Sequence, residues 1–472
     1  MKRFLWLFVI VCLFLICTGC GDTFRPVIIP NPPKFPDPRA AHTVVTISDN
    51  GGKDDQSNNV LPGSAMVVDV SGDSDVSVAD CQKGSPCIGI APVHAVQQTA
   101  TQVLVVNHSV SGVLGDSLSK VSFSGTTVSS ATTISLPPDS APNFVAVAPS
   151  DTTAYVTLPS FVPPSVGVVS TSSNALITTI PVGDNPDAIA VTPDKNKLYV
   201  ANRDSNSISA FNTLDRSPRT INGAAFTEPL WLIARTDSQR VYVLNGNGTL
   251  TTLDTTADTD TVIQSGLNVG AGAAYMVYDT RLNRLYIPSG SQLTVVDVAP
   301  SSPQILSTVV IAPVSPATRN PMDVCFDSSG NQPPNVAAVA VAALPDGSRA
   351  YIGSFYSSGA GNLCPQVTVI NTSGNTFKTN VAIPGFPDAT IPGPFFVKVC
   401  TVTGTRFRFS MAAGGDSSRV YLASCDGGNV NFIDTANDTY LQSLPVPASA
   451  RPPIPPSNQP PPQNPVFMIA GP

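Results

Sequence analysis

Short stretches of alternating apolar and polar residues recur along this chain, separated by turns rich in proline, aspartate, asparagine and glycine. The clearest copy is 185–213 (NPDAIAVTPDKNKLYVANRDSNSISAFNT), in which we expect strands at 188–192, 197–201 and 208–212. The apolar residues recur at a spacing of two, and Val, Ile, Thr and Tyr dominate. This pattern favours strands over the helices of a solenoid.

The middle strand of this unit occurs seven times as an apolar segment that ends in a small or polar residue. The copies are QVLVVN (102–107), AYVTL (154–158), LYVAN (198–202), VYVLN (241–245), LYIPS (285–289), AYIGS (350–354) and VYLAS (420–424). The tyrosines are spaced by 44, 43 and 44 residues in the middle copies and by 65 and 70 residues in the last two steps. A period near 44 with four strands per copy predicts the blades of a β-propeller.

Both ends of the chain carry strand-like segments outside these copies. Three precede the first full copy, at 42–48, 66–70 and 76–80, and the last residues, 464–472 (NPVFMIAGP), copy the first-strand sequence NPDAIAVTP. We therefore expect an all-β propeller of four-stranded blades, with seven intact repeats and an eighth blade completed by both termini. Closing the ring in this way buries strand edges. The alternative is a seven-bladed ring with the terminal strands packed outside it.

The segment LYVAN and the turn before it, TPDKNK (192–197), resemble the repeat of the YVTN family of β-propeller proteins, most clearly over 142–297. The resemblance implies the propeller fold and leaves the activity open, because propellers host many activities. Seven-bladed lactonases are also similar to these repeats, which implies a propeller hydrolase as an alternative function.

The N-terminus has the pattern of an export signal. Two basic residues precede a 13-residue apolar run, 4–16, which suits a signal-peptide core and is too short to span a membrane permanently. The tetrad Cys-Thr-Gly-Cys that follows resembles a bacterial lipobox. We expect a signal peptide at 1–19 with Cys20 as the lipidated residue, and an ordinary secretory signal is the alternative. A lipidated Cys20 would place the protein in the cell envelope. We expect it in the outer membrane or at the cell surface rather than in the inner membrane.

Proline-rich segments flank the predicted propeller. Residues 20–40 are expected to form a stiff tether that reaches roughly 60 Å. Residues 41–472 then form a single propeller domain, within which 447–465 is a proline-rich connector. Charged residues make up only 12% of the chain, and the net charge is -7 with no Lys/Arg cluster outside the signal. Nucleic acid is therefore not an expected partner.

Six cysteines remain beyond the signal and Cys20, which in an exported chain suggests three disulfides. Equivalent positions in neighbouring repeats predict the pairs Cys325–Cys364 and Cys400–Cys425 and leave Cys81–Cys87 as a local loop. Zinc is the alternative, but no pair has CxxC spacing and the histidines are only three. We expect neither a metal nor a cofactor.

Catalytic motifs are scarce: there is no G-x-S-x-G, P-loop or HExxH. His94 and His108 lie in and after predicted strands, where histidines are usually structural. Four aspartates share one turn position, which indicates hydrogen bonding within the turn. These are Asp194, Asp237, Asp346 and Asp416.

A binding site is expected on the face where the fourth-to-first and second-to-third loops meet, because these loops differ between copies. The candidates that the loops carry are Asn143, Asp187, Arg203, Glu228 and Asp323. The chain is thus predicted to be a lipid-anchored, non-catalytic binding or scaffold protein with a protein or polymer partner. The alternative is the lactonase-like hydrolase, which needs acids and a histidine or metal at the channel mouth.

Overall fold

The seven repeated segments form the second strands of seven sheets, and their central residues, six tyrosines and Leu104, are buried. The computed structural model describes residues 43–50, 61–70, 72–80, 86–108, 115–223, 226–331, 333, 336–358, 362–387, 409–449 and 462–470. These residues belong to the unit Pro38–Pro472, which is distinct from Met1–Asp37. The predicted signal peptide, Cys20 and the 20–40 tether lie outside the described residues. No helix in the described part is long and apolar enough to cross a membrane.

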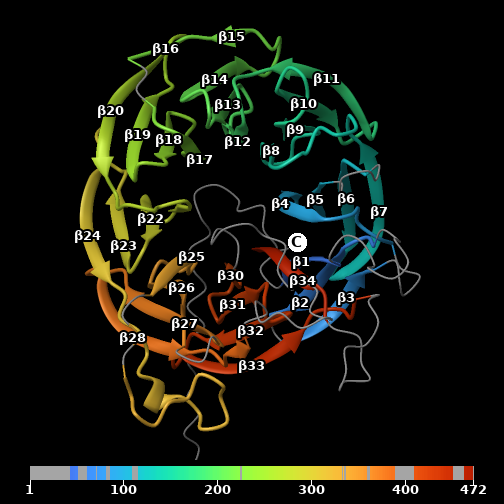
Figure 1. Cartoon of the computed structure of the whole chain (residues 1–472). Coiled ribbons are helices and arrows are strands. Elements are labelled where there is room, and N and C mark those ends of the chain that lie inside the picture. The colour runs from blue at the N-terminus through green and yellow to red at the C-terminus, as the bar shows by residue number, and fades with distance from the viewer. Residues whose placement is uncertain are drawn as a thin grey trace, which may run out of the picture. The chain divides into compact units, whose positions relative to one another are not determined.

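Eight sheets follow one another around a ring, each with its first strand at the centre and its fourth strand at the rim (Figure 1). The first four sheets contain β1 (Thr43–Asp49), β2 (Ser64–Asp69), β3 (Ser74–Ala79) and β34 (Asn464–Ala470); β4 (Pro92–Thr99), β5 (Gln102–Asn107), β6 (Ser117–Ser124) and β7 (Thr127–Ser135); β8 (Val145–Val147), β9 (Thr153–Leu158), β10 (Ser165–Ser170) and β11 (Ala175–Pro181); and β12 (Pro186–Val191), β13 (Lys197–Asn202), β14 (Ser207–Asn212) and β15 (Pro218–Arg219).

The other four sheets complete the ring. They contain β16 (Ile221–Asn222), β17 (Pro229–Ala234), β18 (Arg240–Asn245), β19 (Thr249–Asp254) and β20 (Asp260–Asn268); β21 (Val277–Asp279), β22 (Arg284–Ser289), β23 (Gln292–Asp297) and β24 (Gln304–Val310); β25 (Ala337–Ala343), β26 (Arg349–Ser357), β27 (Asn362–Asn371), β28 (Thr376–Ala382) and β29 (Phe386–Pro387); and β30 (Phe409–Ala413), β31 (Arg419–Ser424), β32 (Asn429–Asp434) and β33 (Thr439–Pro445). A short 3-10 helix, η2 (Pro316–Thr318), lies in the insertion before β25.

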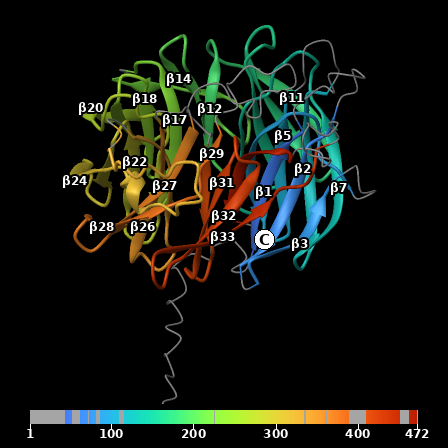
Figure 2. The same cartoon turned by 60° about the horizontal axis from the view of Figure 1, so that its bottom comes forward.

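The eighth blade is built from both ends of the propeller, as the sequence predicts. β34 pairs antiparallel with β1, with Ile47 opposite Phe467, and β2 and β3 complete the sheet. The blue and red strands lie side by side in Figure 1, and the turned view of Figure 2 agrees. Ser64 Oγ donates to Gln463 Oε1 at 2.6 Å across the same seam. The seven-bladed alternative is therefore wrong, and the part of the 447–465 connector at 450–461 lies outside the described residues.

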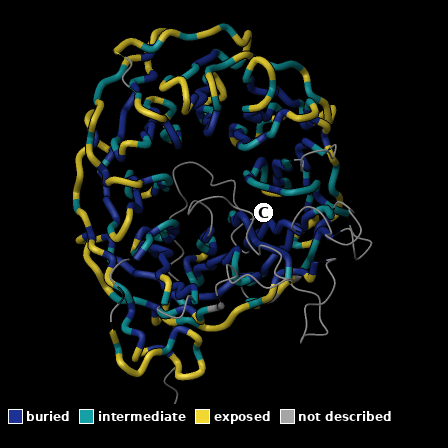
Figure 3. The backbone as a smooth tube through the Cα atoms, in the orientation of Figure 1, coloured by how far each residue is buried: buried dark blue, intermediate teal, exposed yellow. Residues whose placement is uncertain are grey.

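The core lies between neighbouring blades, where the middle strands of each sheet are buried and the rim strands are exposed (Figure 3). The asparagine that ends several second strands has a structural task. Asn202 Nδ2 donates to the hydroxyls of Ser207 and Ser209 at 3.1 and 2.9 Å, which fastens β13 to β14. Asn107 and Asn245 fasten their hairpins in the same way. This explains the asparagine of the repeated motif.

The four repeated aspartates hold their turns, as the sequence predicts. Each Oδ1 accepts the backbone N–H two residues on, at 2.8–3.1 Å. The residues concerned are Asp194, Asp237, Asp346 and Asp416. Burial by itself would raise the pKa of the Asp194 and Asp237 carboxyl groups. The hydrogen bonds to each carboxylate, joined at Asp237 by the neighbouring Arg235 and Arg240, together outweigh burial and hold the pKa below its usual value.

Three other aspartates each link their own blade to the blade before it. Asp260 of β20 accepts the Tyr199 hydroxyl at 2.8 Å, and Asp438 accepts the Tyr351 hydroxyl. Asp73, before β3, accepts the Tyr421 hydroxyl at 3.2 Å. A guanidinium also meets each carboxylate. These contacts join the buried tyrosine of one blade to the start of the fourth strand of the next blade, or to the residue just before it. The contact of Asp73 spans the seam at which the ring closes.

Candidate functional site

The loops that enter the first strands and those that join second to third strands lie on one face of the ring. Arg203 N donates to Asn185 O at 3.0 Å, and Glu228 N donates to Asn206 Oδ1 at 2.7 Å. We call this the collar face. The first-to-second turns and third-to-fourth loops meet on the opposite face, where Thr213 N donates to Asn196 O at 3.0 Å. We call that the turn face.

Four of the five sequence candidates lie on the collar face, within three consecutive blades. Asn143 precedes β8 and Asp187 lies in β12, each directly after the proline that introduces its first strand. Arg203 follows β13 and Glu228 precedes β17, and both are exposed. Asp187 is buried, with 9% of its surface exposed. The structure thus gathers these four at one side of the channel mouth.

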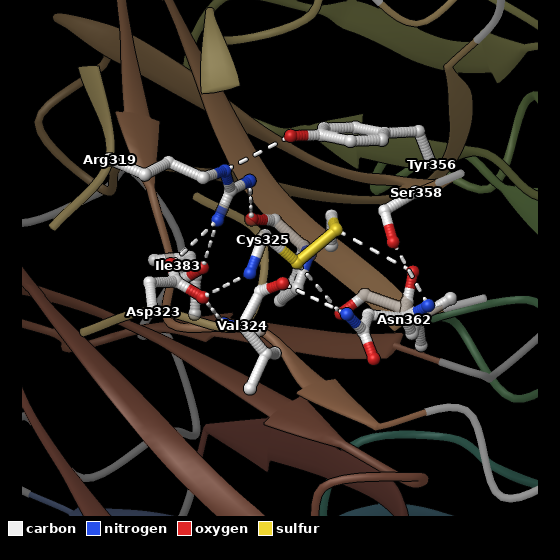
Figure 4. Close-up of a disulfide and its surroundings, with 12 residues drawn as sticks. Arg319, Asp323, Val324, Cys325, Tyr356, Ser358, Asn362 and Ile383 are labelled. Atoms are coloured by element: carbon white, nitrogen blue, oxygen red, sulfur yellow. Dashed lines mark hydrogen bonds and ion pairs between the residues drawn. A yellow bond between two sulfur atoms is a disulfide. The ribbon is translucent and has the colours of Figure 1, made fainter. Parts of the chain in front are cut away.

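The fifth candidate, Asp323, is part of a structural network in the insertion before β25 (Figure 4). Its carboxylate forms an ion pair with the buried guanidinium of Arg319 at 3.1 Å and accepts the N–H groups of Cys325 and Gly385 at 3.0 and 2.9 Å. Arg319 also donates to Pro365 O and Ile383 O. Asp323 therefore has a structural role, since its contacts hold the insertion to β27. It does not belong with the other four candidates.

The predicted disulfide Cys325–Cys364 is confirmed, and it joins the same insertion to β27 (Figure 4). Cys364 lies inside the third strand of this blade, β27. Cys87 and Cys425 are each disulfide-bonded as well. Their predicted partners, Cys81 and Cys400, lie outside the described residues, so these two pairings stay predictions.

The first strands share a local sequence that places aromatic rings around the channel. In five blades a proline introduces the first strand, and it is followed by one variable residue and then by a residue that lies at the edge of the channel. In β4, β12, β17 and β34 the variable residue has no partner in the second strand, so that it forms a β-bulge. Such a bulge redirects the side chain of the skipped residue. The motifs are Pro-Val-His (92–94), Pro-Asn-Phe (142–144), Pro-Asp-Ala (186–188), Pro-Leu-Trp (229–231) and Pro-Val-Phe (465–467).

The third residues of these motifs, together with Tyr275, form an arc of rings that we call the aromatic collar. The ring centroids of Phe467 and His94, and of His94 and Phe144, are 4.7 Å apart. Phe144 contacts Trp231 at 5.6 Å and 86°, and Trp231 contacts Tyr275 at 5.0 Å and 71°. Ala188 occupies the equivalent position between Phe144 and Trp231. The collar therefore links five blades directly beneath the collar face.

On the other side of the ring small residues take the collar position. Ala340 and Ser410 lie there, and a cavity with about 10 Å³ of water-accessible space opens between Tyr275 and Phe467. That space suits about one water molecule. Met468 N donates to the Ser410 hydroxyl at 2.9 Å, so this polar group of the lining already has a partner.

The collar carries little fixed charge. His94 is buried, and its Nδ1 accepts the Val145 N–H at 3.5 Å, which requires an unprotonated Nδ1. Among the described residues no three His, Cys, Asp or Glu side chains gather as metal ligands. The arrangement is suited to contact with rings and apolar groups, with Asp187 as the buried acid beside it.

Sequence reasoning treated His94 as a structural strand residue and did not single out Phe144, Trp231, Tyr275 or Phe467. The available signal was the aromatic residue two positions after the proline of the first strands. One aromatic residue at this position in a single repeat indicates little. The ring shows that the equivalent positions of several blades lie side by side, so that their aromatic rings come into contact.

No protein-family model and no curated protein matches this chain. Among solved structures, apo AztD from Citrobacter koseri aligns with 91% of this chain and 97% of its own at 10% identity, with a TM-score of 0.55. The dihydro-heme d1 dehydrogenase NirN in complex with DHE aligns with 93% of this chain and 77% of its own at 12% identity, with a TM-score of 0.53. At these identities the likeness shows the β-propeller fold alone.

Proposed function

We propose that this protein is an exported, lipid-anchored propeller with YVTN-type repeats that binds a protein or polymer partner, without catalysis, on its collar face. The observation that carries the proposal is the aromatic collar beneath the variable loops of that face. The half-buried rings of Trp231 and Tyr275, surrounded by polar loop residues, supply a hydrophobic contact with a polar rim, which is the composition of binding surfaces. The rings of His94, Phe144 and Phe467 are buried and support them from below. The lipobox-like tetrad supports the anchor, and the proline-rich tether would hold the ring away from the membrane.

The binding test compares two exposed acids on opposite faces. Glu228→Lys changes the charge of the collar face, and Asp258→Lys makes the same change on the turn face, in the loop between β19 and β20. A partner captured from isolated envelopes is purified, and its dissociation constant is measured with each variant. We expect about tenfold weaker binding for Glu228→Lys and unchanged binding for Asp258→Lys. If both variants changed the dissociation constant equally, the partner would not bind on the collar face. If the protein hydrolysed a lactone and lost this activity on substitution of Asp187, the non-catalytic function would be wrong.

The anchor is tested by Cys20→Ser. We expect the variant to appear in a soluble fraction or to remain unprocessed, because no lipid can be attached. Processing and membrane retention identical to the wild type would refute the lipid anchor.

A further inference from the structure

We propose that a second copy of this chain binds along β24, the fourth strand of its blade, so that the β24 strands of two rings pair antiparallel at their rims. This inference does not depend on the proposed function, because β24 lies on the rim of the ring and not on the collar face.

Exposed apolar side chains gather on β24. Five of its seven residues are exposed. Three of them are large and apolar, namely Ile305, Leu306 and Val310, and these are between 41% and 69% exposed. Within the described part of the chain, no other strand has more than one exposed large apolar side chain. An apolar surface on an outer strand favours contact with another chain.

The outer edge of β24 offers backbone groups for hydrogen bonding. β24 pairs with β23 on its inner side, and no described strand pairs with its outer side. Figures 1 and 2 show β24 at the outside of the ring. Along an antiparallel edge about every second residue points its N–H and C=O away from the sheet. The occupant that satisfies such a row of donors and acceptors is another extended chain.

The ring itself contains an example of this kind of pairing. In the preceding blade, β16 lies parallel to β20 on the outer edge of that sheet, with Ile221 opposite Asp260. A fourth strand of this propeller therefore accepts a further extended segment at the rim. The outer edge of β24 is the corresponding place in the next blade.

β24 lacks the features that protect the other outer strands. Charged side chains and prolines discourage pairing at a sheet edge. Such residues occur in six fourth strands, as Asp75 in β3, Pro181 in β11, Arg219 in β15, Asp260 in β20, Lys378 in β28 and Pro445 in β33. β7 has neither feature, but its exposed side chains are those of serine and threonine. β24 has neither feature and is also apolar on its exposed side.

A second copy of the chain supplies the matching edge already formed. Two identical strands pair antiparallel about a two-fold axis, which is the commonest symmetry of protein dimers. Because β24 contains no charged residue, this pairing places no like charges opposite each other. A flexible peptide would lose conformational entropy on becoming extended, whereas β23 already holds β24 in that conformation.

The test introduces single cysteines along β24 in the full chain and oxidises isolated envelopes that contain each variant. The disulfide-linked product of twice the chain mass is then measured on a non-reducing gel. About a two-fold axis only the residue nearest the axis faces its own copy closely enough for a disulfide. We therefore expect a maximum at one position or two adjacent positions. The substitutions are Gln304→Cys, Ile305→Cys, Leu306→Cys, Ser307→Cys, Thr308→Cys and Val310→Cys.

The matched control is Thr133→Cys, at an exposed position of the polar fourth strand β7. It should give no more of the double-mass product than the unsubstituted chain. Adding Ile305→Lys to the best cysteine, or Thr308→Lys if position 305 holds that cysteine, should reduce the product at least about tenfold, because two like charges enter one interface. Ile177→Lys places the same charge on β11 and should leave the product unchanged.

Equal amounts of product along β24 and at Thr133, or no product at all, would overturn the inference. A product that the lysine does not reduce would overturn it too, and a product of another mass would show that a different protein covers β24. Urea unfolding checks that each lysine variant is folded, and the position dependence of the cysteines decides the matter if one is not. None of these outcomes changes the test of the collar face with Glu228→Lys.

Discussion

Asp73 belongs to the closing blade, yet its carboxylate contacts two side chains of the neighbouring blade. Its Oδ1 accepts the Tyr421 hydroxyl at 3.2 Å, and Arg419 Nε donates to Oδ2 at 2.9 Å. Asp73→Ala leaves the buried tyrosine without this acceptor, so we expect a loss of about 1–3 kcal/mol of unfolding free energy. Urea denaturation followed by circular dichroism measures it.

The matched control is Asp75→Ala in the same blade, because Asp75 is exposed on the rim strand β3. We expect a change within about 0.5 kcal/mol. If both variants lost the same unfolding free energy, the loss would come from removing a negative charge in this part of the blade. The contacts of Asp73 with Tyr421 and Arg419 would then not be its cause.

Tyr242 gives the fold a dependence on alkaline pH. Burial raises its pKa from 10.0 to about 12. Since the folded-state pKa lies above the unfolded one, the neutral phenol favours the folded state below pH 10.0, and this contribution is lost as the pH rises from there through about 12. Burial raises the pKa of Tyr199, Tyr351 and Tyr421 as well.

We therefore expect Tyr242→Phe, which cannot ionise, to reduce the decline in unfolding free energy between about pH 9.5 and 11.5 by roughly 2 kcal/mol. The loss of the 3.4 Å hydrogen bond to Val298 O lowers stability equally at every pH and does not affect the slope. Urea midpoints across this range measure the slope. Parallel curves for the variant and the wild type would show that Tyr242 ionises in the folded state as easily as in the unfolded one.

At the scale of elements, the blade of β25–β28 depends on a disulfide that fastens its long insertion. Cys325 and Cys364 are 39 residues apart in sequence and bonded in the structure. Replacing both with serine should cost about 2–4 kcal/mol of unfolding free energy, because the unfolded chain regains its loop entropy. Denaturant unfolding measures the loss, and a cost below about 0.5 kcal/mol would show that the Arg319 network alone holds the insertion.

Pairing equivalent repeat positions also predicts Cys400–Cys425 and leaves Cys81–Cys87 as a local loop. Non-reducing peptide mapping should recover both pairs alongside Cys325–Cys364. A peptide that joined Cys87 to Cys425, or free thiols at these positions, would refute the assignment.

At the scale of the whole molecule, the ring closes only because β34 pairs with β1. Deleting residues 466–472 removes most of β34, including Val466, Phe467 and Met468, which are buried in the clusters on both sides of the closing blade. It also breaks the collar at the contact between Phe467 and His94. We expect the melting temperature of the entire propeller to fall, since both adjacent blades lose their neighbour.

Deletion of residues 471–472 alone serves as the control, because it leaves β34 (Asn464–Ala470) intact. The control should melt with the full chain. A melting temperature unaffected by the longer deletion would mean that the ring is stable without its eighth first strand.

The sequence by itself determined the features that repeat. The 44-residue period, the four turn aspartates and the copy of a first strand at 464–472 each recur with the blade, and they led to the fold, the turn hydrogen bonds and the eighth blade. The Cys325–Cys364 pair followed from the same equivalence. Such features are set by hydrogen bonding and side-chain alternation within a single sheet, so they are readable from local sequence.

Only the tertiary structure decided what lies between sheets. In the aromatic collar Phe467 contacts His94 and Phe144 contacts Trp231, although both pairs are far apart in the sequence. These residues meet because the ring brings equivalent positions of different blades together. Asp323 looked like a loop ligand, but the fold brings Arg319 to it. Contacts of this kind depend on the lateral packing of blades, and the spacing of residues within one repeat contains no information about which side chains meet across that packing.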